Sequence, residues 1–188
     1  ADSLRRIARE FVVDMATDGV IYAEARWAPQ QHLTGGLSAA AATEAVQAGL
    51  VDGMESASRS GTTIIARQIL CLMRHLDVPE DVVDLAVNHA PGVVGVDIAG
   101  PEDGFPLTPF TNALTRIQAA GIHLTVHAGE AAGPESVLDA LDHGAERLGH
   151  GVRIIEDRDE SEWGPIAQRV LSNQVPLEVC PTSNTQTG

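Results

Sequence analysis

Two histidines and a glutamate lie next to small residues, in an arrangement typical of a catalytic or metal-binding site. His127 and Glu130 are separated by Ala-Gly, which lets the chain turn so that an imidazole and a carboxyl approach one pocket. His150 lies between Gly149 and Gly151, where the missing side chains permit close approach of a ligand. Imidazole is a common metal ligand, and imidazole with a carboxyl forms an acid–base pair. The pattern suggests metal-assisted attack of water, and spacing alone leaves a structural role equally open.

Strands must position these side chains. In segment 122–127 (IHLTVH) apolar and polar residues alternate, which places His127 on the polar face at the carboxyl end of a strand. The next predicted strand ends at His150. Neighbouring parallel strands are about 4.8 Å apart, so His127, Glu130 and His150 can share one site. His123, near the start of its strand, is expected to be a hydrogen-bonded core residue.

Helical and strand-like segments alternate along the whole chain. Ser38 is predicted to cap the second helix, Pro79 to open the third, and Thr108 to cap the fourth ahead of Pro109. The predicted helices are 4–18, 38–60, 79–89, 108–121, 135–141 and 163–172, and the predicted strands are 20–27, 63–73, 93–98, 122–127, 147–150 and 175–180.

Six consecutive helix–strand units in one domain, residues 1–188, require parallel strands. A TIM-type (β/α)8 barrel has about 250 residues, or about 31 per unit, so six units need about 188. A doubly wound sheet is the rival, but the GxGxxG turn of a dinucleotide-binding sheet is absent from the sequence. The predicted fold is therefore an α/β barrel represented by six of its eight units, with polar residues bunched at the carboxyl ends of the strands.

The composition excludes several classes of function. A formal charge of −14 argues against nucleic acid and against an anionic membrane as partners. All 12 basic residues are arginine, which excludes Schiff-base chemistry and the lysine of a P-loop. No apolar stretch reaches the about 18 to 20 residues of a transmembrane helix. Cys71 and Cys180 form no CxxC motif, which favours a reducing, cytoplasmic location.

Six short segments resemble the adenosine deaminase family of metal-dependent amidohydrolase barrels. Each segment is a weak signal alone, but together they follow the order and approximate spacing of the family and cover nearly the whole chain. They are 22–29 (YAEARWAP), 69–75 (ILCLMRH), 96–102 (VDIAGPE), 127–130 (HAGE), 148–151 (LGHG) and 178–183 (EVCPTS).

The resemblance implies hydrolytic deamination of adenosine and 2′-deoxyadenosine to inosine and ammonia by a zinc-activated water. It makes His127 a zinc ligand and Glu130 the acid that protonates N1 of the purine. It makes His150 the histidine that orients or deprotonates the water. The backbone N–H of Gly100 would donate to the purine N3. The implied cofactor is one Zn²⁺, and the implied partner is a small-molecule purine nucleoside.

The sequence departs from the family pattern in its metal ligands. The His-x-His pair of the family's first strand does not occur, and the sequence stops at Gly188, before the Asp-Asp pair of the eighth strand. His127 is then one family ligand of four, and three protein ligands are usual for catalytic zinc. We expect residues 1–188 to be the middle of a longer enzyme without its first and eighth strands. Alone, this piece should be inactive and should self-associate through its open edges.

Three other functions stay open. An adenine deaminase or another purine amidohydrolase would share much of the site, and a non-catalytic remnant of a barrel could bind a purine or a partner protein. A sugar-phosphate isomerase or aldolase is less well supported because no phosphate nest is evident and lysine is absent. Asp97 and Glu102 either contact a ligand or brace loops.

Overall fold

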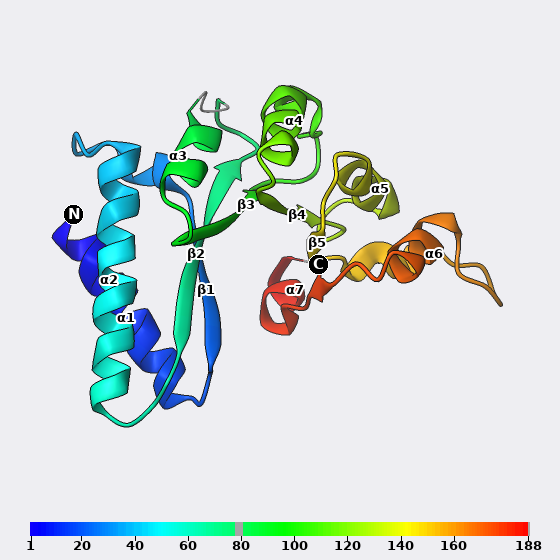
Figure 1. The fold of residues 1–188 in the computed structure, drawn as a ribbon. Helices are drawn as coiled ribbons and strands as arrows, with labels where there is room; N and C mark the ends of the chain where they lie inside the picture. Colours follow the sequence, from blue (N-terminus) through cyan, green and yellow to red (C-terminus); the bar gives the residue numbers. More distant parts are fainter. Residues whose placement is uncertain (78–80, 188) are drawn as a thin grey trace. The chain divides into compact units, whose positions relative to one another are not determined.

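Helices and strands alternate in the computed structural model, which describes residues 1–77 and 81–187 (Figure 1). The six parallel strands are hydrogen-bonded in sequence order, β1-β2-β3-β4-β5-β6. This is the order of a (β/α)8 barrel and confirms the predicted fold class. The strands are β1 (Tyr22–Trp27), β2 (Ile65–Met73), β3 (Val93–Ala99), β4 (His123–Ala128), β5 (Arg147–His150) and β6 (Leu177–Glu178).

Helices alternate with these strands along the chain, as the sequence predicts. None of those in the described part of the chain combines the length and the apolarity that crossing a membrane requires. The α-helices are α1 (Asp2–Thr17), α2 (Ala39–Arg59), α3 (Val82–Asn88), α4 (Thr111–Ala119), α5 (Pro134–Asp142), α6 (Pro165–Ser172) and α7 (Pro181–Thr187). Short 3₁₀ helices are η1 (Pro29–His32), η2 (Thr108–Phe110) and η3 (Val152–Glu156).

The chain divides into two compact units, to both of which β2 and β3 contribute. Unit 1 comprises Ala1–Cys71 and Asp84–Gly95, and unit 2 comprises Leu72–Val83 and Val96–Gly188. The expectation of one domain over residues 1–188 stays a prediction.

Unit 1 is built on the packing of α1 and α2 beside β1 and β2 (Figure 1). Val12, Leu50 and Ala66 are completely buried in its core. Gly53 of α2 allows the helices to approach closely, because a Cβ atom there would lie 2.5 Å from the Cβ of Val12. The predicted cap of α2 is confirmed, since the Ser38 hydroxyl accepts a hydrogen bond from the backbone N–H of Ala41 at 3.1 Å.

Unit 2 contains the strands that carry the predicted site. β5 pairs in parallel with both β4 and β6, and Ala128 of β4 lies opposite His150 of β5. Leu124, Val126 and Leu148 are at most 1% exposed and belong to the buried apolar core. The carboxyl ends of β4 and β5 therefore meet at one edge of the sheet.

Two predicted boundaries are wrong. Thr108 does not cap an α-helix, because Leu107 before it already has helical dihedral angles and a 3₁₀ turn precedes α4. An N-cap residue needs an extended backbone instead. The predicted strand 175–180 pairs only at Leu177–Glu178, where it lies beside the four-residue strand β5. Pro79, predicted to open a helix, lies outside the described residues.

Candidate active site

A buried carboxylate holds His127. The Nδ1 atom of His127 lies 3.1 Å from Oδ1 and 2.9 Å from Oδ2 of Asp97, a fully buried residue of β3. A carboxylate only accepts hydrogen bonds, so in the neutral ring Nδ1 carries the proton and Nε2 has the lone pair. That nitrogen can accept a proton or bind a metal, and this is the pattern in which outer carboxylates orient metal-binding histidines.

His127 and His150 lie side by side, with ring centroids 5.1 Å apart. Gly149, which is opposite His127 in the strand register, makes room for this ring. A Cβ atom at Gly149 would lie 3.0 Å from both Cγ and Nδ1 of His127. His150 itself has a φ of +67°, in the left-handed region that non-glycine residues rarely adopt. Such conformations cost about 1–3 kcal/mol and cluster at functional sites.

Glu130 completes the predicted group. Its Oε2 lies 3.3 Å from Nε2 of His150, so a proton can pass between the two side chains. On the opposite side of the His150 ring, Nδ1 lies 3.0 Å from the amide nitrogen of Asn184. An amide nitrogen donates, so Nδ1 accepts and the proton of the neutral ring sits on Nε2, facing Glu130. The structure thus brings together His127, Glu130 and His150.

Helix α7 supplies two site residues that the sequence analysis missed. Besides Asn184, Ser183 donates a hydrogen bond from its hydroxyl to Oε1 of Glu130 at 3.3 Å. The available signal was Pro181, because proline is favoured in the first turn of a helix and here begins α7. The pattern of segment 178–183 predicts no role for the side chain of Ser183, and Asn184 lies beyond that segment.

Glu102 and Arg74 are buried charged residues next to the site. Burial raises the pKa of the Glu102 carboxyl, but hydrogen bonds from Ser136 and backbone amides outweigh burial and hold that pKa below its usual value. Burial lowers the pKa of the Arg74 guanidinium, while the nearby carboxylates of Glu102, Asp139 and Asp97 oppose that change. Glu102 is therefore an ionised carboxylate with its counter-charge close by.

Gly100 follows β3, on the loop that joins Asp97 to Glu102. It has a φ of +98°, and a Cβ atom there would lie 3.1 Å from Nδ1 of His75 and 3.3 Å from Cε of Met73. A side chain would therefore be both strained and crowded at this position. The structure places Gly100 against the turn after β2, and its contact with a purine stays a prediction.

The prediction for His123 is correct about its hydrogen bond and wrong about its burial. Its Nδ1 lies 2.8 Å from Oε2 of Glu146, so the expected hydrogen bond is present. The side chain is 71% exposed, however, because His123 is the first residue of β4 and lies outside the core.

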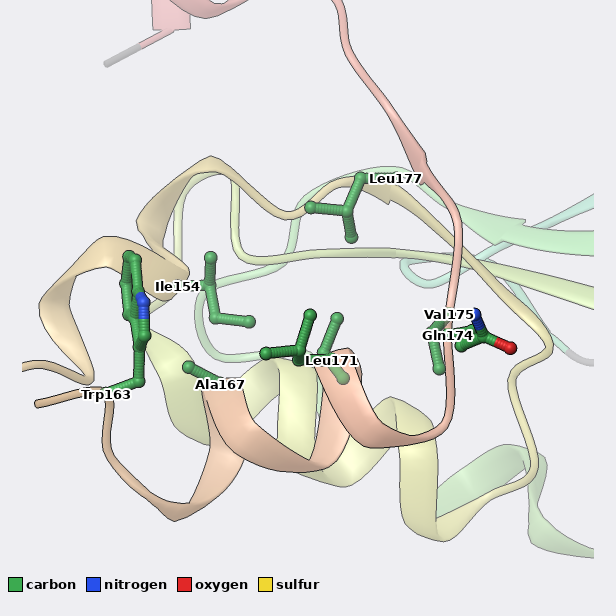
Figure 2. A pocket seen from close by; sticks show the side chains of 8 residues that line it. Ile154, Trp163, Ala167, Leu171, Gln174, Val175 and Leu177 are labelled. Carbon is green, nitrogen blue, oxygen red and sulfur yellow. The ribbon is translucent and has the colours of Figure 1, made fainter.

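A separate pocket of about 500 Å³ lies along α6, as Figure 2 shows. Its lining is mostly apolar and includes Ile154, Trp163, Leu171 and Leu177. None of the three site residues lines this pocket. It therefore lacks the acid–base groups that chemistry on a purine would use.

The side chains present do not complete a metal site. Within residues 1–77 and 81–187, no group of three or more His, Cys, Asp or Glu residues is placed to hold a metal ion. His127 offers one suitable nitrogen, whereas catalytic zinc usually has three protein ligands.

Comparison with known proteins identifies the family of the chain. A family model described as adenosine deaminase matches residues 1–188. The chain belongs to the adenosine deaminase family. It is 44% identical over 194 aligned residues to the adenosine deaminase of Mycolicibacterium gilvum, covering all of this chain and 54% of that protein. The chain thus spans about half the length of the curated relatives it matches.

Solved structures of related enzymes have the same fold. The N6-methyl-AMP deaminase of Arabidopsis thaliana aligns with a TM-score of 0.84 and 30% identity over 99% of this chain and 54% of that one. A zinc-bound amidohydrolase from Burkholderia ambifaria aligns with a TM-score of 0.82 and 32% identity, over 97% of this chain and 49% of that one. An adenine deaminase from Arthrobacter aurescens aligns with a TM-score of 0.79 and 27% identity, over 98% of this chain and 54% of that one. Family and neighbours together support a hydrolase of the deaminase class.

Proposed function

We propose that the longer protein containing residues 1–188 deaminates adenosine and 2′-deoxyadenosine by hydrolysis. Water adds at C6 of the purine and ammonia leaves, which converts adenosine to inosine. The contact of Glu130 with His150 beside the oriented ring of His127 carries this proposal. Curated relatives named adenosine deaminase support the choice of substrate.

Each site residue has a role that suits its surroundings. Glu130 would deliver a proton to N1 of the purine and so make C6 more electrophilic. His150 would orient the attacking water, or accept its proton at Nε2 after passing the Nε2 proton to the Glu130 carboxyl, which lies 3.3 Å away. The backbone N–H of Gly100 would donate to N3.

We propose one Zn²⁺ as the cofactor of the complete protein. His127 is a suitable ligand because its Nδ1 faces Asp97 and its Nε2 keeps the lone pair. The zinc-bound amidohydrolase among the structural neighbours supports this choice. The other ligands would come from parts of the longer protein beyond residues 1–188.

An adenine deaminase is the second candidate. The similarity to the Arthrobacter aurescens adenine deaminase favours it specifically. Incubating the full-length protein with adenosine and with adenine, and measuring ammonia release, separates the two activities. Faster release from adenosine is expected, and release from adenine alone would replace the first proposal with the second.

The variant Glu130→Gln tests the role of the acid in the full-length protein. A glutamine keeps the size of the side chain but carries no acidic proton, so turnover of adenosine should be abolished while bound zinc, measured by atomic absorption, is retained. Glu160→Gln is the matched control at an exposed position and should turn over adenosine like the wild type. Near-normal turnover by the Glu130 variant would refute the acid role.

A further inference from the structure

One buried carboxylate organises the turn that carries Glu130. The side chain of Glu102 is 7% exposed and accepts five hydrogen bonds, four from consecutive backbone amides and one from a hydroxyl. Oε1 accepts from the N–H of Gly129 and the hydroxyl of Ser136, and Oε2 accepts at 3.0, 2.8 and 3.0 Å from the N–H groups of Glu130, Ala131 and Ala132.

Regular structure does not supply partners for these amides. The turn lies after the end of β4 at Ala128 and before the start of α5 at Pro134. Consecutive N–H groups that converge in a turn form an anion-binding concavity. In this chain the anion is the carboxylate of Glu102, which lies on the loop after β3. These N–H groups of the turn therefore have Glu102 as their acceptor.

Arg74 fixes the same segment from its other end. One guanidinium nitrogen donates to the carbonyl of His127 at 2.9 Å, and another donates to the carbonyl of Phe105 at 2.5 Å. The guanidinium is attracted by the Glu102 carboxylate. Buried charged side chains thus hold both ends of this segment. Arg74 binds the carbonyl of His127, and Glu102 binds the N–H groups of residues 129–132.

We propose that Glu102 is a positioning residue that sets the place of the Glu130 carboxyl, an inference that rests on the proposed function. The N–H of Glu130 donates to Oε2 of Glu102, while the carboxyl of Glu130 reaches Nε2 of His150 at 3.3 Å. Fixing the backbone of Glu130 fixes the origin from which its side chain reaches the site. A displacement of about 1 Å in a catalytic group can cost about 100-fold in rate.

A purely stabilising role for Glu102 makes a different prediction. Loss of stability lowers the amount of folded protein, but it leaves the turnover of each folded molecule unchanged. Displacement of Glu130 lowers kcat of the folded protein, because the chemical step loses its acid, and changes KM little. Measuring kcat and KM on folded protein separates the two roles.

Glu102→Gln in the full-length protein is the test. The glutamine NH₂ group donates, so it would face N–H groups that also donate and at least one of them loses its acceptor. We expect kcat for adenosine to fall about 100-fold with KM within about threefold of wild type. Hydrogen exchange followed by mass spectrometry should show faster exchange of the amides of residues 129–132.

Asp157→Asn is the matched control. The carboxylate of Asp157 accepts a hydrogen bond at 2.8 Å from the N–H of Ala167 in the first turn of α6. This variant should lower the melting temperature but keep kcat within about twofold of wild type. A loss of kcat in this control as large as that in the Glu102 variant would overturn the positioning role.

Ser136→Ala covers the case in which the Glu102 variant does not fold. It removes one of the five hydrogen bonds to Glu102, and we expect a loss of kcat of about three- to tenfold in a folded protein. Wild-type kcat in both folded variants, or a loss of kcat with unchanged exchange at 129–132, would overturn the inference. If the wild type itself releases no ammonia from adenosine, the proposed function fails, and the exchange measurement still tests whether Glu102 holds the turn.

Discussion

At the scale of single residues, Asp97 decides which nitrogen of His127 faces the site. Its carboxylate is completely buried and contacts Nδ1, which leaves Nε2 for chemistry. Asparagine at this position would keep the shape but lose the negative charge that holds the ring. Because outer-shell carboxylates of this kind raise the basicity of the ligand, their loss typically costs about 10- to 100-fold in activity or metal affinity.

Asp97→Asn in the full-length protein should therefore lower kcat/KM for adenosine about 10- to 100-fold and weaken zinc binding. Asp142→Asn is the control, since Asp142 pairs with Arg169 on the surface and its side chain is 57% exposed. That variant should retain wild-type kinetics. Unchanged kinetics and zinc content in the Asp97 variant would show that the contact of Asp97 with His127 contributes neither to activity nor to zinc binding.

The sequence predicts the three convergent residues better than the residues that hold them. His127, Glu130 and His150 stand out because glycines flank them and strands precede them. Asp97 contacts His127, which is 30 positions further along the chain, and Glu102 contacts Glu130, which is 28 positions further along. Such contacts depend on how β3 lies beside β4, which composition and spacing do not specify. The roles of both carboxylates therefore stayed open until their partners were known.

At the scale of elements, the turn between β4 and α5 requires a glycine at position 129. Gly129 is buried with a φ of +71°, and a Cβ atom there would lie 2.8 Å from Cγ2 of Val137 and 3.3 Å from Cα of Gly151. A side chain at this position meets two separate costs, one from the backbone conformation and one from the neighbouring atoms.

Gly129→Ala and Gly121→Ala separate these costs. Gly121 has a φ of +67°, but no heavy atom lies within 4 Å of the point that a Cβ atom would occupy, so its substitution should cost only about 1–2 kcal/mol of left-handed strain. Gly129→Ala should cost about 1–3 kcal/mol more because it also overpacks the turn. Urea unfolding of the full-length protein measures both values. Equal losses would mean that the turn relaxes freely around an added methyl group.

Element order is predictable from this sequence, whereas element ends are less so. Alternation and helical periodicity identify all six strands and the first six α-helices of the described part of the chain. Of the predicted strand 175–180, only Leu177 and Glu178 pair with the four-residue strand β5, and the extent of such pairing depends on the neighbouring strand. The sequence does not predict helix α7, because its seven residues, PTSNTQT, show no apolar periodicity.

At the scale of the whole molecule, the sheet ends at β1 and at β6 within the described residues. Apolar side chains are exposed near both strands, among them Ile21 at 78% and Val179 at 71%. Leu171 of α6, beside the pocket in Figure 2, is also 71% exposed. Strand edges flanked by exposed apolar residues favour pairing with another chain.

A protein consisting of residues 1–188 alone should therefore self-associate, and sedimentation velocity should show a mass that grows with concentration. Val179→Lys should reduce this association, because a charge next to an edge strand opposes pairing. Val87→Lys is the control at an exposed apolar residue of α3 and should leave association unchanged. The same protein should bind no stoichiometric zinc and leave the absorbance of adenosine constant, since His127 is one ligand where about three are needed. A monomer that binds zinc tightly would contradict both the open-edge argument and the incomplete ligand set.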